Sequence, residues 1–231
     1  MKQMLMSLSV YVIAYFILIT VVLGMLYIYP KLELHLLLNT YHNSILDTFF
    51  KYYSTLAEWP LYILALIPMF KKKFKLTLFF GLCELTGGIM LQILKHTICT
   101  ERPVCAFEHY QNIILPLVQG VNMHHSNSFP SGHASTFFMF FTCSAIFLAY
   151  HYRNKMNDNH KKLLALLTLG TMMLLFLVLA TLGAYSRVYL SQHFLSDVCM
   201  GSIIGFVTPC LIFYFGRHKI LKLKLNETKN D

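Results

Sequence analysis

Five long apolar runs constrain this chain more than any other feature. A helix needs roughly 20 residues to cross the hydrocarbon core of a membrane, and each run has about that length with at most one acidic or basic residue. A sixth run, 52–70, is interrupted by Glu58, Pro60 and Pro68, and we expect it to span as well. The five stronger runs are 8–29, 76–94, 134–152, 163–185 and 198–215. The sequence therefore predicts an all-α integral membrane protein with six transmembrane helices.

Composition and charge exclude two other classes of protein. Apolar residues make up 56% of the chain and charged residues 13%, which excludes an ordinary soluble domain. The net charge of +9 does not indicate a nucleic-acid surface, because it gathers in segments that six spans place on one side of the membrane. Those segments, Lys2, 71–75, 153–162 and 217–231, hold 14 of the 19 basic residues. This positive-inside pattern predicts that both termini are cytoplasmic, and we expect no nucleic-acid partner.

One membrane domain accounts for residues 1–231, because the sequence contains no internal repeat, low-complexity tract or second domain. Between the first two spans, 31–51 mixes leucines with His35, Asn39 and Asp47. We expect this segment to form an amphipathic connector at the membrane interface. The sequence gives no sign of an obligate protein partner.

The longest polar stretch, 99–129, follows the third span on the outer side. Loops longer than about 15 residues are usually functional or disordered. Cys99 and Cys105 lie in this loop, and in an oxidising compartment they could close a disulfide ring around Arg102. Spacing alone leaves that bond open, because two thiols also need the right geometry to pair.

Charged and histidine side chains gather at the outer ends of spans three to six. The positive-inside orientation places all four ends on one side of the membrane without using these residues. They are Lys95 and Arg102-Pro103 after span three, Pro130-Ser131-Gly132-His133 at the start of span four, Ser186-Arg187 at the end of span five, and His193 and Asp197 at the entry to span six. We therefore expect them to form one site at the outer face.

Three cations, two histidines and an aspartate at one depth suit phosphoryl transfer. The transition state of that reaction spreads negative charge over three equatorial oxygens, which preorganised donors must hold. Lys95, Arg102 and Arg187 can supply those donors. Arginine meets phosphate oxygens in a bidentate fashion, and lysine acts as a movable point charge.

Two local patterns add the remaining chemistry. Residues 130–133 are typical of a helix start, where Ser131 caps the helix and free backbone N–H groups face an anion. Gly132 would let the backbone approach that anion closely. His193 and Asp197 are four residues apart and so share one helix face. There the carboxylate can hold one ring nitrogen and leave the other free to attack.

The three motifs together resemble the signature of the type-2 phosphatidic acid phosphatase superfamily, which includes lipid phosphate phosphatases and vanadium haloperoxidases. Every motif position is filled, in the family's order and spacing, over roughly residues 90–200. The resemblance implies a phosphatase that uses no metal and no cofactor. It also implies a phosphorylated membrane lipid as substrate, hydrolysed at the periplasmic face of the bacterial inner membrane.

The same resemblance implies a role for each motif residue. His193 would attack phosphorus to form a phosphohistidine, Asp197 would orient it, and His133 would protonate the leaving alkoxide. Water would then release phosphate. The phosphate oxygens would be bound by Lys95, Arg102, Arg187, Ser131 and the Gly132 amide, with Pro103, Pro130 and Ser186 in support.

Two other functions stay open. The basic cluster could hold an anionic lipid without cleaving it, as a transporter or lipid-binding protein does, and the helix-breaking Pro68 and Pro209 would fit that function. A metallohydrolase is the second alternative, although no carboxylate cluster accompanies the histidines. Its ligands would be His124, His125, His133, His193 and Asp197.

The substrate and the role of Glu84 are less constrained. The sequence resembles lipid A phosphatases of the Gram-negative envelope, including the 4′-phosphate type, so we expect lipid A. Undecaprenyl pyrophosphate or phosphatidylglycerophosphate would need the same site. Glu84 lies about 16 Å of helix from Lys95, too far to act on the same phosphate. We expect it to hydrogen-bond a neighbouring span, with a headgroup site or a proton path as the alternative.

Overall fold

The computed structural model describes residues 2–70, 74–109, 115–152 and 159–216. Within these ranges every regular element is a helix, which confirms the all-α prediction. Most of the basic residues that predicted the topology lie outside the described residues, in 71–73, 153–158 and 217–231. The elements are α1 (Lys2–Ile28), α2 (Lys31–Leu38), α3 (Ser44–Ser54), the 3-10 turn η1 (Thr55–Ala57), α4 (Pro60–Phe70), α5 (Phe74–Thr97), α6 (Pro103–Glu108), α7 (Gly132–Tyr152), α8 (Asn159–Tyr189) and α9 (Leu195–Gly216).

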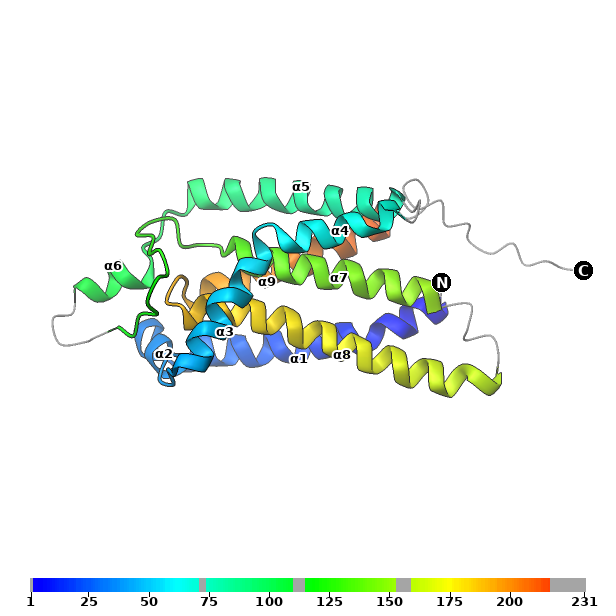
Figure 1. Ribbon diagram of the computed structural model, residues 1–231, viewed down its shortest axis with the longest axis horizontal. Coiled ribbons are helices and arrows are strands. Elements are labelled where there is room, and N and C mark those ends of the chain that lie inside the picture. The colour runs from blue at the N-terminus through cyan, green and yellow to red at the C-terminus, as the bar shows by residue number, and fades with distance from the viewer. Residues whose placement is uncertain (1, 71–73, 110–114, 153–158, 217–231) are drawn as a thin grey trace, which may run out of the picture.

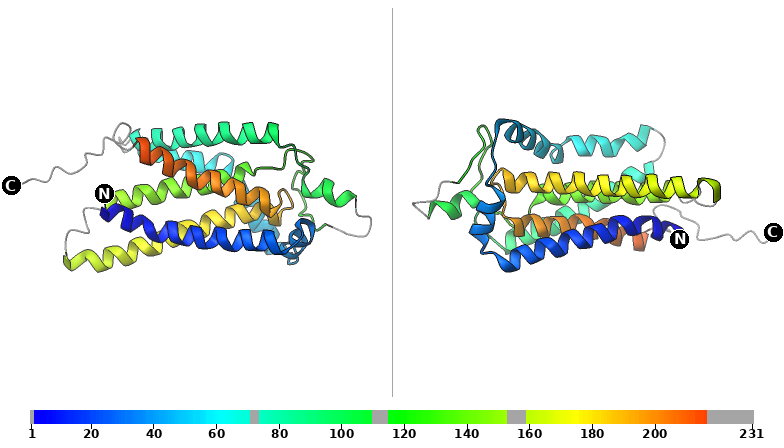
Figure 2. Two further views of the ribbon diagram at one scale, coloured as in Figure 1. Left: turned by 180° about the vertical axis from the view of Figure 1, so that it is seen from behind. Right: turned by 90° about the horizontal axis from the view of Figure 1, so that it is seen from below.

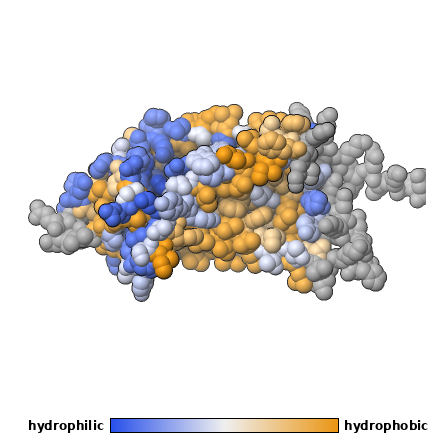
Figure 3. Space-filling model, in the orientation of Figure 1, coloured by the Kyte–Doolittle hydropathy of each residue, from blue (hydrophilic) through white to orange (hydrophobic). Residues whose placement is uncertain are grey.

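Five of these helices, α1, α5, α7, α8 and α9, are long and apolar enough to cross a membrane. They correspond to the five stronger runs of the sequence and lie roughly along one common direction (Figure 1, Figure 2). We call the end of the bundle that carries α2, α6 and residues 115–131 the loop end. The surface is hydrophobic along the middle of the bundle and hydrophilic at the loop end (Figure 3). A multi-pass membrane protein accounts for this distribution.

The sixth predicted span is not one helix. Residues 44–70 form α3, η1 and α4 in succession, and these run from the loop end toward the opposite end (Figure 1). α4 alone has 11 residues, which is about 16 Å of helix and roughly half of a membrane core. Pro60 explains the break, because proline lacks the N–H that a continuous helix needs. Glu58 is left exposed in the turn before it.

The predicted connector is broken as well, because α2 ends at Leu38 and α3 begins at Ser44. The side chain of Asn43 caps α3 by accepting the backbone N–H groups of Ile45 and Leu46, at 3.1 and 2.9 Å. α2 does not simply lie on the interface, since His35 is buried to 1% exposure. The connector therefore packs one face against the protein and leaves the other face exposed, as an amphipathic segment does.

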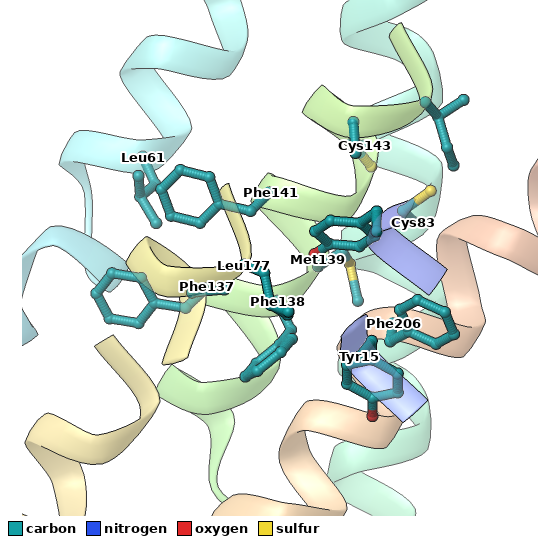
Figure 4. Close-up of a cluster of buried hydrophobic side chains, with 14 of the residues drawn as sticks. Tyr15, Leu61, Cys83, Phe137, Phe138, Met139, Phe141, Cys143, Leu177 and Phe206 are labelled. Carbon is teal, nitrogen blue, oxygen red and sulfur yellow. The ribbon is translucent and has the colours of Figure 1, made fainter. Parts of the chain in front are cut away.

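α7 is the central helix of the bundle. Buried residues make up 67% of its most apolar segment, against 11% for α1, so α1 faces the lipid and α7 does not. α9 packs closely on α7 at two glycines, Gly201 and Gly205. A Cβ atom at either position would lie 2.3 Å from a backbone oxygen, that of Ser131 just before α7 or that of Ser135 within it. Aromatic rings fill the core between α1, α7 and α9, where Tyr15 stacks on Phe206 with ring centroids 3.9 Å apart (Figure 4).

Candidate functional site

The predicted site residues come together at the loop end from segments far apart in the sequence. Lys95, Arg102, Arg187 and His193 all lie close enough to His133 to interact with it electrostatically, so the three cations and two imidazoles share one region of the loop end. The residues are Lys95 in the last turn of α5, Arg102 and Pro103 at the start of α6, Pro130 and Ser131 just before α7, Gly132 and His133 in its first turn, Ser186 and Arg187 in the last turn of α8, His193 between α8 and α9, and Asp197 in the first turn of α9.

His193 and Asp197 are joined through Ser128, a residue that no motif predicted. The Ser128 hydroxyl donates to Asp197 Oδ2 at 2.5 Å and lies 3.4 Å from His193 Nδ1. The direct distance from His193 Nδ1 to Asp197 Oδ2 is 3.7 Å. Because a hydroxyl has one hydrogen, and Ser128 gives its hydrogen to the carboxylate, Nδ1 must donate to Ser128. The pattern assigns the ring proton to Nδ1 and leaves Nε2 with a free lone pair.

The surroundings of His193 keep it uncharged. Its ring is 2% exposed. Burial is the main cause that lowers the pKa of His193 to about 4; the Asp197 carboxylate opposes the shift, and Arg187 and Arg102 reinforce it. At neutral pH the imidazole is therefore neutral, which is the form that can act as a nucleophile.

Backbone hydrogen bonds tie the motifs to one another. The carbonyl oxygen of Arg187 accepts the N–H groups of Gln192 and His193, at 2.9 and 3.1 Å. The carbonyl oxygen of Asp197 accepts the N–H of Ser131 at 3.0 Å, so α9 holds the start of α7 directly. A shift of the turn that carries His193 and Asp197 would therefore displace the start of α7 as well.

Arg102 is held in place by carbonyl oxygens and an amide. Its Nε donates to the Ser126 carbonyl at 2.9 Å, and its Nη1 donates to the backbone carbonyl and Oε1 of Gln192, at 3.0 and 3.3 Å. Gln192 immediately precedes His193 in the sequence. The guanidinium plane of Arg102 is consequently fixed beside the imidazole of His193. No motif or spacing in the sequence indicated the importance of Gln192.

Arg187 reaches across the site to α3. Its Nη1 donates to the Ser54 hydroxyl at 3.2 Å, and Glu58 interacts with it electrostatically. Arg187 Nε is buried and has no hydrogen-bond partner among the described residues. A buried N–H of a charged group that lacks a partner is costly, and a bound anion would satisfy it.

His133 also carries an unpaired polar atom. Its Nε2 is buried without a hydrogen-bond partner in the described part of the chain, and the nearest carboxylate oxygen, Glu58 Oε1, is 3.7 Å away. The His133 side chain is 28% exposed and that of Glu58 is 54% exposed. Lys95 is only half-buried and interacts electrostatically with Arg102, Arg187 and Asp197. This side of the site is open.

The start of α7 is built as a cap. Ser131 is fully buried, and its Oγ accepts the backbone N–H of Ala134 at 3.4 Å, which leaves its hydroxyl hydrogen available. A side chain at Gly132 would meet open space, so protein packing does not require a glycine there. Ser186, by contrast, donates to the Gly183 carbonyl within α8 at 2.6 Å and serves its own helix.

A second polar cluster braces the turn before His193. Asn39 Nδ2 donates to Ser191 Oγ at 2.7 Å and to the Val188 carbonyl at 3.2 Å. His35 Nε2 lies 3.3 Å from the same Ser191 hydroxyl. Ser191 has the left-handed φ of +52°, which is uncommon for a residue other than glycine. α2 therefore holds the turn that positions His193.

Several polar residues that the sequence singled out make no side-chain-to-side-chain hydrogen bond or ion pair with the site residues in the described part of the chain. His124 and His125 are exposed, and the described residues contain no group of three or more His, Cys, Asp or Glu side chains that could hold a metal ion. Cys99 and Cys105 are both free thiols. Glu84 Oε2 accepts a hydrogen bond from Tyr62 of α4 at 3.2 Å, which confirms the expected bond to a neighbouring helix.

Comparisons with known proteins place the fold and the family of this chain. No curated protein sequence matches the chain significantly. Among solved structures, it is similar to LpxE from Aquifex aeolicus, with 24% identity over 80% of this chain and 94% of that chain and a TM-score of 0.58. It is also similar to the first transmembrane PAP2 type phosphatidylglycerolphosphate phosphatase from Bacillus subtilis, with 21% identity over 90% of this chain and 96% of that chain and a TM-score of 0.56. At these identities the likeness shows a shared fold.

The family is shown by a separate comparison of the sequence alone. Residues 76–220 match the model of the PAP2 superfamily. The matched segment is more than half of the chain and includes every predicted site residue from Lys95 to Asp197. This protein belongs to the PAP2 superfamily.

Proposed function

We propose that this protein is a membrane lipid phosphatase that removes phosphate from a lipid headgroup through a phosphohistidine intermediate. The observation that carries the proposal is the meeting of three cations and two imidazoles in one region of the loop end, contributed by α5, α6, α7, α8 and the turn before α9. Two of those groups, Arg187 and His133, have buried nitrogens without a protein partner. A tetrahedral phosphate is the ligand that these unpaired groups and the open space beside Gly132 would accept.

His193 attacks phosphorus in this mechanism. Its Nε2 lone pair is free because Nδ1 donates to Ser128, and Asp197 holds Ser128 in turn. The bond to the lipid oxygen breaks as the bond to Nε2 forms, and His133 gives a proton to the leaving oxygen. Water then attacks the phosphohistidine, returns a proton to His133 and releases phosphate.

The cations hold the phosphate through both steps. Arg102 and Arg187 are fixed in position by Gln192 and Ser54, so they are preorganised for the charge that develops on the phosphate oxygens. Lys95, the Ser131 hydroxyl and the Gly132 backbone N–H supply the remaining donors. Pro103 and Pro130 are buried and support the segments that carry them.

The mechanism derived from these residues needs no metal ion and no cofactor. The metallohydrolase alternative would require His133, His193 and Asp197 to share one ion with His124 and His125, which are exposed. Turnover that persists after dialysis against a chelator is the expected result. Loss of activity that a divalent cation restores would favour the alternative instead.

The charge distribution supports a periplasmic site in a bacterial inner membrane. The basic segments of the sequence adjoin the ends of α4, α5, α7, α8 and α9 that lie opposite the loop end (Figure 1), and the positive-inside rule assigns these segments to the cytoplasm. Lipid A is the substrate that we favour, because the sequence resembles lipid A phosphatases and the fold is similar to LpxE. Undecaprenyl pyrophosphate and phosphatidylglycerophosphate are the alternatives, and the second is suggested by the Bacillus subtilis neighbour.

The test is phosphate release by the purified protein in detergent from lipid A, undecaprenyl pyrophosphate, phosphatidylglycerophosphate and phosphatidic acid. We expect His193→Ala to lower release from every substrate to below about one thousandth of wild type, because no nucleophile remains. His151→Ala, at the far end of α7, is the matched control and should be fully active. If the wild type binds these lipids and releases no phosphate, a lipid-binding protein or transporter is the better assignment.

A further inference from the structure

Glu58 is the least expected residue at this site. It follows η1, in the turn that breaks the sixth predicted span, and no motif includes it. Its Oε1 lies 3.7 Å from His133 Nε2, and its carboxylate also interacts electrostatically with Arg187. Ser54, one turn earlier, accepts the hydrogen bond from Arg187. Residues 54–58 therefore form one wall of the site.

His133 needs an anion beside it to act as an acid. Burial of the ring first, and then the neighbouring charges of Arg187, Lys95 and Arg102, disfavour a positive charge on the imidazole. The other carboxylate of the site, Asp197, is already occupied. It accepts hydrogen bonds from Ser128 and from the Phe194 backbone N–H, at 2.5 and 2.9 Å. Glu58 is the carboxylate that the described structure places next to the His133 ring.

We propose that Glu58 is a positioning residue whose negative charge, 3.7 Å from His133 Nε2, favours the protonated form of His133 that gives its proton to the leaving oxygen. The inference rests on the proposed function, since it requires a leaving group that takes up a proton. When the bond between phosphorus and the lipid oxygen breaks, the electron pair stays on that oxygen and the Nε2 proton moves to it. Water later returns a proton to Nε2, and Glu58 neither gives nor takes a proton in these steps.

A choice of leaving group tests this role directly. An alkyl phosphate leaves as an alkoxide and needs a proton, whereas p-nitrophenyl phosphate leaves as a stable phenolate and does not. We expect Glu58→Gln to lower kcat on the lipid phosphate by about 10- to 100-fold, within the range for general acids. On p-nitrophenyl phosphate, kcat should change by less than about 2-fold. KM should not rise for either substrate, because a negative charge has been removed beside a phosphate site.

Two further variants complete the experiment. His133→Ala should show the same dependence on the leaving group with a larger loss on the lipid phosphate. Glu33→Gln, an exposed carboxylate in the first turn of α2, is the matched control and should leave both substrates unchanged. Thermal unfolding of each variant in detergent reports whether the fold is retained.

The possible outcomes separate this inference from the proposed function. If Glu58→Gln lowers kcat equally on both substrates, Glu58 has only a structural role and the inference is wrong. If neither substrate is affected, Glu58 is a plain surface residue, and the inference is wrong as well. If the wild type releases phosphate from neither substrate, the proposed function itself fails.

Discussion

The two sides of the candidate site differ in burial and in the kind of bond that holds them. On one side, Ser128, Ser131, His193 and Asp197 are at most 2% exposed and are held by backbone and side-chain hydrogen bonds. We call these residues the closed half. On the other side, the open half consists of Lys95, His133 and Glu58, which are half-buried or exposed. The interactions among the residues of the open half are mainly electrostatic and not hydrogen bonds.

This difference separates two requirements of one reaction. A nucleophile and its orienting partner need a fixed geometry and little water, because an attack on phosphorus depends on alignment. A substrate that arrives from a membrane needs an entrance, and long-range attraction from charges can guide its phosphate. The closed half suits the first requirement and the open half the second. Substitutions in the closed half should therefore affect fold or kcat. In the open half they should affect substrate binding at Lys95 and protonation of the leaving group at His133 and Glu58.

The largest effect should follow Gly201→Leu, beneath the closed half. A Cβ at this position would lie 2.3 Å from the Ser131 carbonyl oxygen, a backbone atom that cannot move aside. α7 and α9 would have to separate, and the hydrogen bond from Ser131 N–H to the Asp197 carbonyl would break. We expect a loss of about 3 kcal/mol or more in the free energy of unfolding. Thermal unfolding in detergent would measure it.

Gly170→Ala in α8 is the control for that substitution. A Cβ at Gly170 meets nothing within 4 Å. Alanine is favoured over glycine in a helix by about 1 kcal/mol, so this variant should be unchanged or slightly more stable. Equal stability of the two variants would show that α7 and α9 do not pack as closely as the structure indicates.

The sequence allowed the motif residues of both halves to be identified, for a physical reason. Phosphate binding restricts the residue types, and helix ends restrict the spacing, so Lys95, Arg187 and Asp197 stand out in a chain with few charges. The five strong spans were predictable because each is long and nearly uncharged. Their packing order was not predictable, since apolar residues on every face do not indicate which face meets a neighbour.

The residues that the sequence did not indicate are those that act through distant partners. Ser128 and Gln192 are ordinary polar residues, and their value depends on contacts with residues 69 and 90 positions away in sequence. Ser54 and Glu58 were hidden for a different reason. The pattern of 52–70 predicts a continuous span, whereas in the structure these two side chains lie at the end of α3 and in the turn before α4, where they reach the site.

An intermediate effect should follow Ser128→Ala, within the closed half. The variant removes the hydroxyl between His193 Nδ1 and Asp197 Oδ2 and leaves those atoms 3.7 Å apart, so the ring is no longer held in one tautomer. Loss of an orienting aspartate in a serine protease costs about 10⁴-fold in kcat. Because Asp197 remains, we expect a smaller loss of about 10- to 100-fold. A wild-type kcat would contradict the role of Ser128 in joining His193 to Asp197. Ser144→Ala in α7 is the control.

The smallest effect should follow Lys95→Gln, in the open half. Lys95 is half-buried and contributes charge without a fixed hydrogen bond to a protein group in the described residues, so its loss weakens the attraction for phosphate and leaves the nucleophile aligned. We expect KM to rise about 10-fold, equivalent to roughly 1.4 kcal/mol, with kcat lowered less. Inhibition by inorganic phosphate should weaken by a similar factor. Lys75→Gln, at the other end of α5, should change neither value. A loss confined to kcat would instead show that Lys95 acts mainly in the transition state, because only such a group lowers kcat without weakening binding.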